Sequence, residues 1–341
     1  MKQKILGITT FTLLLAMNQA AAAAQPDGVQ FDGNLVVHAR SQHDENPGNR
    51  SRTGIKTTLT LNATLPVAEN VSAYTRFTYQ RLNNNYGVFS ADYFCNTKQE
   101  NSALDAFGIK YQNAGYKYVL GLQALTLGGG LVYDNTYIGR HALPYAMSVS
   151  KQVGAVNLNF IGAKTNYQGN LSNDNFYVLQ GTYAPDGQSS LGVMLARTSY
   201  GSDTRSRYAF ADSTVNYVSV YGSRAVNDKV GISAELLKSS AKTENQAMQM
   251  SLKYTLDAKN TLTASYYYVE DQAVMTDYNA TEMSAYPNSN AQGYSIAWIH
   301  KFDKNISLKI GDYDYKKIKA VNHSGASTDR NRFTTTLTAK F

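Results

Sequence analysis

Short segments in which apolar and polar residues alternate recur from about residue 28 to the last residue, Phe341. A period of two residues is typical of a β-strand that buries one face. The final segment, FTTTLTAKF, keeps this period to the end of the chain, which predicts a paired strand there rather than a frayed tail. Sixteen candidate strands begin near residues 28, 52, 70, 103, 115, 144, 154, 174, 188, 213, 227, 244, 259, 290, 304 and 329.

The connections between these segments alternate in length. Seven are tight and rich in Asn, Asp, Gly and Pro, and each joins an even-numbered strand to the next one: LPVAEN, QNAG, KQVGA, APDGQ, RAVNDK, LDAKN and FDKN. The others are mostly longer and polar, such as NNNYGVFSADYFCNTKQENS and DQAVMTDYNATEMSAYPNS. One end of the sheet therefore carries short turns and the other carries long loops, which is typical of a barrel in a bacterial outer membrane.

The two faces of each segment differ in polarity. Between residues 55 and 65 the apolar Ile55, Leu59 and Leu61 alternate with polar residues such as Lys56 and Thr58. Side chains cannot fill the lumen of a barrel of about sixteen strands, so the apolar face must point outward into lipid. Aromatic residues beside the short turns fit a membrane-interface girdle: Tyr111, Tyr116, Tyr183, Tyr254, Phe302 and Phe341. The predicted fold is all-β, a transmembrane antiparallel β-barrel with long extracellular loops and short periplasmic turns.

The first 24 residues read as a secretory signal peptide, with two lysines, an apolar run and small residues before a cleavage site after Ala24. Residues 25–341 would then form one barrel domain in the outer membrane. The whole chain carries +7, and removal of Lys2 and Lys4 leaves +5. These basic residues are spread along the chain, so nucleic acid is not an expected partner. The single cysteine, Cys95, excludes an internal disulfide.

Two segments resemble the outer-membrane porins of Gram-negative bacteria: the terminal strand that ends on Phe341, and LQALTLGGGLVYDNTYIGRHALPYAM. The resemblance implies that the barrel assembly machinery reads the last strand and that the chain forms a homotrimer. It also implies that the second segment is a third loop that folds into the pore and narrows it. In that loop, Gly128, Gly129 and Gly130 would permit a sharp departure from the wall.

Alternation within the strands turns several basic residues toward the lumen. Arg40, Lys56 and Arg76 are expected at comparable heights in the middle of the barrel, with Lys110 and Lys117 nearer the periplasmic mouth. The porin resemblance implies that the first three form a basic wall.

The same resemblance places acidic groups on the third loop, opposite the basic wall. Asp134 fits that role, whereas Arg140 on the same loop departs from it. Glu235 is the best candidate for an inward acid on a strand. Because inward bases outnumber inward acids, a weak anion preference is expected.

Catalytic and metal-binding patterns are absent from the sequence. The five histidines lack metal-ligand spacing, and the chain has neither a G-x-S-x-G nor a phosphate-binding GxxxxGK[ST] motif. No catalytic residue, metal or cofactor is therefore expected.

These patterns favour a passive diffusion channel for ions and small hydrophilic solutes, surrounded by outer-membrane lipid and lipopolysaccharide. A channel specific for a sugar or an anion remains open, since SYYYV could supply aromatic stacking, and so does an adhesin with long binding loops. An outer-membrane hydrolase is less favoured, because its catalytic residues would have to cluster at a rim.

Overall fold

The computed structural model describes residues 28–45, 50–83, 100–135, 143–167, 170–202, 204–205, 212–275, 289–319 and 328–341. The predicted signal peptide, Cys95 and Arg140 lie outside these ranges. Within them, no helix has both the length and the apolar character needed to cross a membrane.

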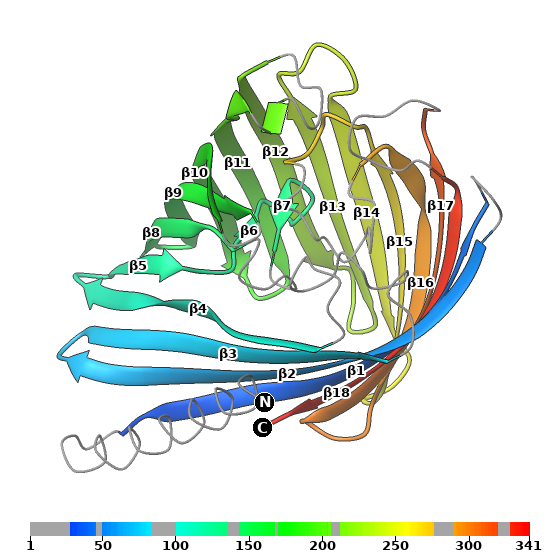
Figure 1. The fold of residues 1–341 in the computed structure, drawn as a ribbon, viewed down its shortest axis with the longest axis horizontal. Coiled ribbons are helices and arrows are strands. Elements are labelled where there is room, and N and C mark those ends of the chain that lie inside the picture. The colour runs from blue at the N-terminus through cyan, green and yellow to red at the C-terminus, as the bar shows by residue number, and fades with distance from the viewer. Residues whose placement is uncertain are drawn as a thin grey trace.

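Sixteen antiparallel strands close into one barrel, in which each strand pairs with its neighbours in the sequence and the last pairs with the first (Figure 1). Every strand begins within four residues of its predicted start, so the predicted barrel is confirmed. The strands are β1 Gln30–Asp44, β2 Arg50–Ala68, β3 Val71–Asn83, β4 Glu100–Asn113, β5 Tyr116–Leu122, β8 Tyr145–Val153, β9 Val156–Tyr167, β10 Asn170–Asp186, β11 Ser189–Ser199, β12 Thr214–Ala225, β13 Val230–Ser239, β14 Gln246–Thr255, β15 Asn260–Val269, β16 Ala291–Lys301, β17 Ile306–Lys317 and β18 Arg330–Lys340. A separate two-stranded sheet joins β6 Thr126–Leu127 to β7 Tyr133–Asp134.

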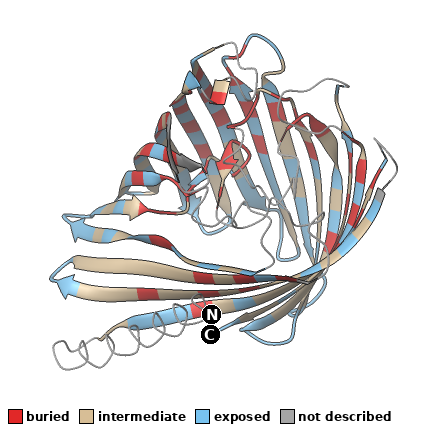
Figure 2. Ribbon diagram, viewed as in Figure 1, coloured by how far each residue is buried: buried red, intermediate tan, exposed pale blue. Residues whose placement is uncertain are grey.

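Exposure alternates along the strands, as the banding of β10 to β13 shows (Figure 2). On β11, Leu191 and Leu195 are 58% and 48% exposed, whereas Met194 between them is fully buried. The exposed Leu191, Val193 and Leu195 on this face are apolar, and the buried residues of the opposite face contact chain inside the barrel. The apolar face therefore points outward, as the width of the barrel requires.

Four of the short turns are stabilised by the same pattern of side-chain to backbone hydrogen bonds. The side-chain oxygens of Asp186, Asn227, Asp257 and Asp303 each accept backbone N–H groups two and three residues later, at 2.6 to 3.0 Å. Such local bonds favour a tight turn over continued strand. At Asp257, the side-chain hydrogen bond from Asn260 and the backbone donors lower the pKa of the carboxyl group.

The barrel closes where β18 meets β1, and Phe341 completes the closure. Its backbone N–H donates to the Gly33 carbonyl oxygen at 3.1 Å, and the Gly33 N–H donates back to the Phe341 carbonyl at 2.9 Å. A Cβ on residue 33 would lie 2.7 Å from the Phe341 ring, so the ring crosses β1 where only glycine leaves room. The side chain itself is 62% exposed on the outer surface.

Phe341→Ala is expected to slow barrel assembly and to reduce the amount of folded, heat-modifiable protein in the outer membrane. The substitution removes the terminal aromatic side chain and its packing over Gly33. Phe302→Ala is the matched control, since Phe302 is a similarly exposed aromatic beside a short turn. Equal amounts of folded protein for the two variants, measured by heat-modifiability on gels, would contradict a special role for the terminal residue.

Candidate pore and its lining

The third long connection leaves the barrel wall at the end of β5. That strand stops at Leu122, and Gly121 adopts a φ of 140° in a position where a Cβ would lie 2.2 Å from the Phe107 carbonyl oxygen. The prediction that Gly128, Gly129 and Gly130 permit this departure is wrong. They form the turn between β6 and β7 instead, where Gly128 has a φ of 61° and Gly130 a φ of 102°.

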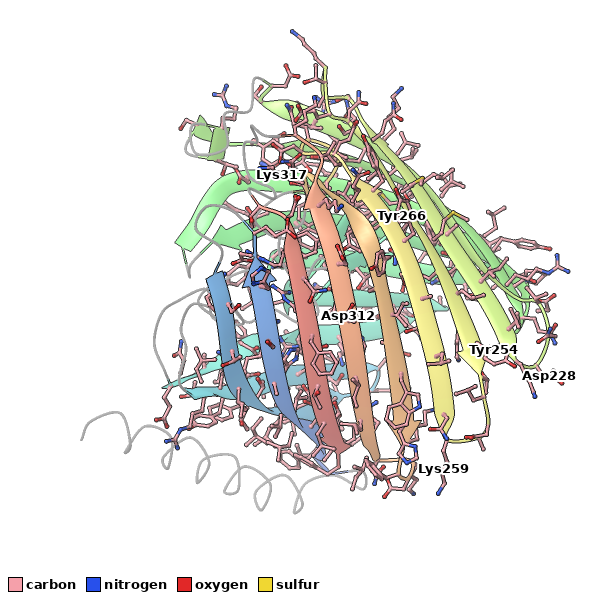
Figure 3. All side chains as sticks on the ribbon, turned by 90° about the vertical axis from the view of Figure 1, so that its right-hand side faces the viewer. Asp228, Tyr254, Lys259, Tyr266, Asp312 and Lys317 are labelled. Atoms are coloured by element: carbon pink, nitrogen blue, oxygen red, sulfur yellow. The ribbon has the colours of Figure 1, made fainter. Side chains whose placement is uncertain are left out.

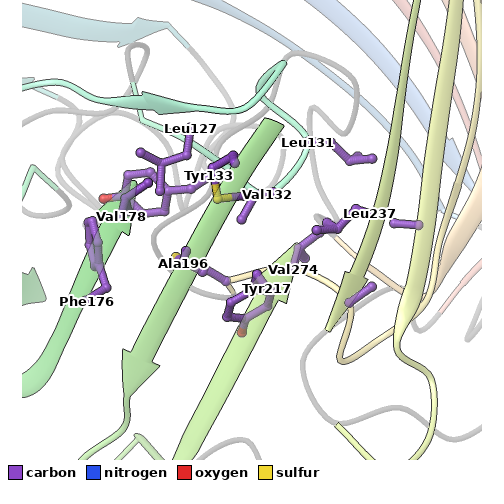
Figure 4. Close-up of a cluster of buried hydrophobic side chains, with 14 of the residues drawn as sticks. Leu127, Leu131, Val132, Tyr133, Phe176, Val178, Ala196, Tyr217, Leu237 and Val274 are labelled. Carbon is purple, nitrogen blue, oxygen red and sulfur yellow. The ribbon is translucent and has the colours of Figure 1, made fainter. Parts of the chain in front are cut away.

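This small hairpin packs against the inner face of the barrel (Figure 4). Leu127, Leu131, Val132 and Tyr133 are at most 1% exposed. They share one buried cluster with lumen-facing residues of β10 to β13: Phe176, Val178, Ala196, Tyr217 and Leu237. Residues 126–134 therefore lie inside the barrel, against one side of its wall, and burial of these apolar side chains holds them there.

Glu235 on β13 anchors the tip of the hairpin. Its carboxylate accepts the backbone N–H of Leu131 at 2.9 Å, a backbone hydrogen bond from Gly129 and the hydroxyl of Ser219. A Cβ on Gly128 or Gly129 would lie 2.5 or 2.8 Å from this carboxylate, so the approach requires glycine. Glu235 faces inward as predicted, but it is 3% exposed and holds the hairpin rather than lining water.

Asp134 lies at the end of β7 and is half-buried, where its carboxylate accepts the Thr126 hydroxyl at 3.4 Å. The neighbouring Asn135, not singled out from the sequence, fixes the base of the hairpin. Its side-chain oxygen accepts the Leu125 N–H and its amide donates to the Tyr133 hydroxyl, both at 2.8 Å. A second loop adds to the support, since Met275 donates its backbone N–H to the Val132 carbonyl at 3.1 Å.

The structure brings together only part of the predicted basic wall. Arg40 faces Gly54 in the register of β1 and β2, which places it two residues from Lys56. Arg76 faces Asn62, six residues from Lys56 along β2, or about 20 Å along the strand. The expectation that all three lie at comparable heights is therefore wrong for Arg76.

Arg76 has an acidic partner that alternation could not reveal. A β-bulge in β4 lets Asp105 turn inward beside Ala106, because the register shifts between Arg76 and Phe77. Two hydrogen bonds join the groups, from Arg76 Nε to Oδ1 at 2.8 Å and from its terminal nitrogen to Oδ2 at 2.9 Å. Asp105 is fully buried, so this pair adds little net charge to the lumen.

Other arginines take the place of Arg76 near Arg40. Arg332 on β18 and Arg52 on β2 both lie in register with Gln42, and Arg332 donates to the Gln42 side-chain oxygen at 2.6 Å. Arg330 and Arg52 both pair with Asp44. The same alternation rule, extended to the first residues of β2 and of β18, would have found these arginines.

The two lower lysines keep their predicted direction. Lys110 lies with its ammonium group 5.1 Å from the centre of the Tyr74 ring, on the lumen face of β4. Lys117 is exposed and lies in register with Gln112 on that same face.

A row of six serines crosses the other side of the lumen. Each faces the next in register from β11 to β16, and two neighbouring hydroxyl pairs, Ser190–Ser223 and Ser251–Ser265, are hydrogen-bonded at 2.8 Å. The row comprises Ser190, Ser223, Ser233, Ser251, Ser265 and Ser295. It continues through Tyr313 to Arg332, so hydroxyl groups and arginines form one polar band around the inner wall.

Within the described ranges, no group of three or more His, Cys, Asp or Glu residues is arranged to hold a metal ion.

Comparisons with known proteins agree with this architecture. No family model matches the sequence, and no curated protein matches it. Among solved structures, OmpF of Salmonella typhi in complex with daunomycin matches with a TM-score of 0.64 at 11% identity, over 92% of this chain and 98% of that one. Two mutants of the Rhodopseudomonas blastica porin match over 92% of this chain and 100% of theirs, with TM-scores of 0.57 and 0.56 at 11% and 12% identity. The chain therefore has the sixteen-stranded fold of the porins.

Proposed function

We propose that the protein is a passive diffusion channel for ions and small hydrophilic solutes in the outer membrane. The observation that carries this proposal is a closed sixteen-stranded barrel whose outer face is apolar and whose inner face bears serines and arginines. A barrel of this width holds an aqueous lumen. The buried hairpin at 126–134 occupies one side of that lumen, which supports size filtering at this level.

Swelling of proteoliposomes in uncharged sugars of increasing size tests the channel directly. The swelling rate should fall steeply as the sugar grows, because the hairpin reduces the free cross-section. Swelling no faster than in protein-free liposomes, from preparations that are folded by heat-modifiability, would contradict the proposal.

The orientation belongs to the same proposal: the short turns face the periplasm and the long loops face outward. Lys242 lies in a connection at the loop end and Asp228 in a turn at the other end, and Figure 3 shows Asp228 beside the turn end of the strands. In a Cys95→Ser background, Lys242→Cys should react with a membrane-impermeant maleimide in intact cells, and Asp228→Cys should not. The reverse pattern would invert the topology.

The proposal extends to targeting and assembly. Residues 1–24 would direct export, the barrel assembly machinery would read the strand that ends on Phe341, and three copies would form a homotrimer in lipid that contains lipopolysaccharide. The Rhodopseudomonas blastica neighbour is a porin by name, which supports transport rather than catalysis for this chain.

A further inference from the structure

The outer surface of three alternate strands carries one basic side chain each, at the same distance from the turns. Lys164 on β9, Arg197 on β11 and Lys238 on β13 are exposed and share the outward face of their strands with Phe160, Leu195 and Leu236. Each lies nine residues after the last residue of the preceding turn, Ala155, Gln188 or Lys229. Nine residues of a strand tilted by about 40° rise roughly 23 Å, close to the height of the apolar band of such barrels.

This row of basic residues faces no carboxylate in register. Arg197 pairs with Tyr177 and Asn216, and Lys238 pairs with Val218 and Gln246. The register partners of Lys164 are Tyr145 and Asn175. On β17 acidic rather than basic side chains face outward, since alternation turns Asp312 and Asp314 outward beside Ile296 and Tyr294. The positive charge of the row is therefore confined to one side of the barrel.

An apolar hollow of about 880 Å³ lies on the outer wall below this row. Gly222, Ala234 and Ala264 form its floor because their small side chains leave the wall thin, and larger residues such as Met250 and Tyr266 flank them. Leu236 lines the hollow and is the outward residue next to Lys238, about 7 Å along β13. Figure 3 shows Tyr266 toward the loop end of β15.

We propose that this surface binds a membrane lipid that carries a phosphate headgroup. Its acyl chains would lie in the hollow, and its phosphate would contact Lys238 and Arg197, with Lys164 extending the positive surface. Basic side chains at a membrane surface attract anionic headgroups, and the hollow supplies apolar surface at the depth of the chains. The inference rests on the proposed outer-membrane location, with the long loops and hence this row in the outer leaflet.

Trp298, the only tryptophan of the chain, provides a local reporter. It lies on the outward face of β16, two residues from Ile296, which lines the hollow. The protein is reconstituted in phosphatidylcholine, and brominated phosphatidic acid or brominated phosphatidylcholine is added in increasing amounts. Bromine on the acyl chains quenches tryptophan on contact, so preferential quenching by phosphatidic acid measures occupancy of the hollow by the phosphate lipid.

Arg197→Gln with Lys238→Gln should reduce the preference for phosphatidic acid about 25-fold, since each basic residue near an anionic surface contributes roughly fivefold. The charge-matched control, Lys253→Gln with Lys301→Gln, alters exposed residues of the lumen face and should retain the preference. Ala234→Leu should also reduce it, because the new side chain fills the floor while keeping the outer surface apolar.

Three results would overturn the lipid site. They are equal quenching of the wild-type protein by the two lipids, equal loss of preference in the lumen control, and abolition of the preference by millimolar inorganic phosphate, which would indicate a simple anion site. Single-channel conductance of the Arg197→Gln, Lys238→Gln variant should match the wild type. Failure of the lipid site is thereby distinguishable from failure of the channel.

Discussion

Replacing Glu235 by alanine is expected to raise the single-channel conductance and to make the open-channel current noisier. The substitution removes the acceptor for the Leu131 and Gly129 N–H groups inside the barrel. Hydrogen bonds to a charged group contribute about 1.5 to 3 kcal/mol each, so loss of two shifts the equilibrium toward a displaced hairpin by about 100-fold or more. The apolar contacts of Leu127 and Tyr133 remain, so only the glycine turn of the hairpin is expected to move away from the barrel wall.

Glu235→Gln should have a smaller effect, because a side-chain oxygen is retained to accept one N–H. The matched control is Gln249→Ala, which removes a polar lumen side chain that lies in register with Glu235 and donates to Ser251. Conductance in planar bilayers and liposome swelling with larger sugars should both rise in the order Gln249→Ala, Glu235→Gln, Glu235→Ala. Identical conductance of the wild type and Glu235→Ala would show that the carboxylate does not position the hairpin.

The barrel could be predicted closely because its signals are local. Alternation with a period of two defines each strand, and turn residues such as Asp257 and Asp303 mark where strands end. Closure follows from physics, since hydrocarbon does not tolerate an unpaired sheet edge. The strand that ends on Phe341 therefore had to pair with the first one, as it does at Gly33.

The candidate site was predicted less well because its geometry depends on register and on irregularity. Alternation gives the direction of Arg76 but not its height relative to Lys56, which the register of β2 and β3 sets. The bulge at Asp105 reverses the expected direction of one side chain, and no residue of ENSALDAFG signals it. The burial of Glu235 depends on a hairpin about 100 residues earlier in the chain, a contact that strand periodicity does not predict.

The pairing of Arg76 with Asp105 changes which residues are expected to determine the ion selectivity. Arg40 and Lys56 lie close together on the lumen face, near Arg332 and Arg52, whereas Arg76 is neutralised by Asp105. Fixed positive charge in a water-filled pore attracts anions, so a weak anion preference is proposed. Salt screens the effect over about 10 Å at 0.1 M and about 3 Å at 1 M, so the preference should nearly vanish at the higher concentration.

Arg40→Ala with Lys56→Ala is therefore expected to move the reversal potential in a potassium chloride gradient toward cation preference, most strongly near 0.1 M. Arg76→Ala with Asp105→Ala is the matched control, because it removes one charge of each sign from the same wall and should leave the potential in place. Arg76→Ala alone exposes the uncompensated Asp105 carboxylate and should also move the potential toward cations. A wild-type channel that prefers cations at 0.1 M, or an unchanged reversal potential in the Arg40, Lys56 variant, would show that these residues do not determine the ion selectivity. A shift of equal size in the Arg76, Asp105 pair would instead indicate that pore shape, rather than charge, governs the measurement.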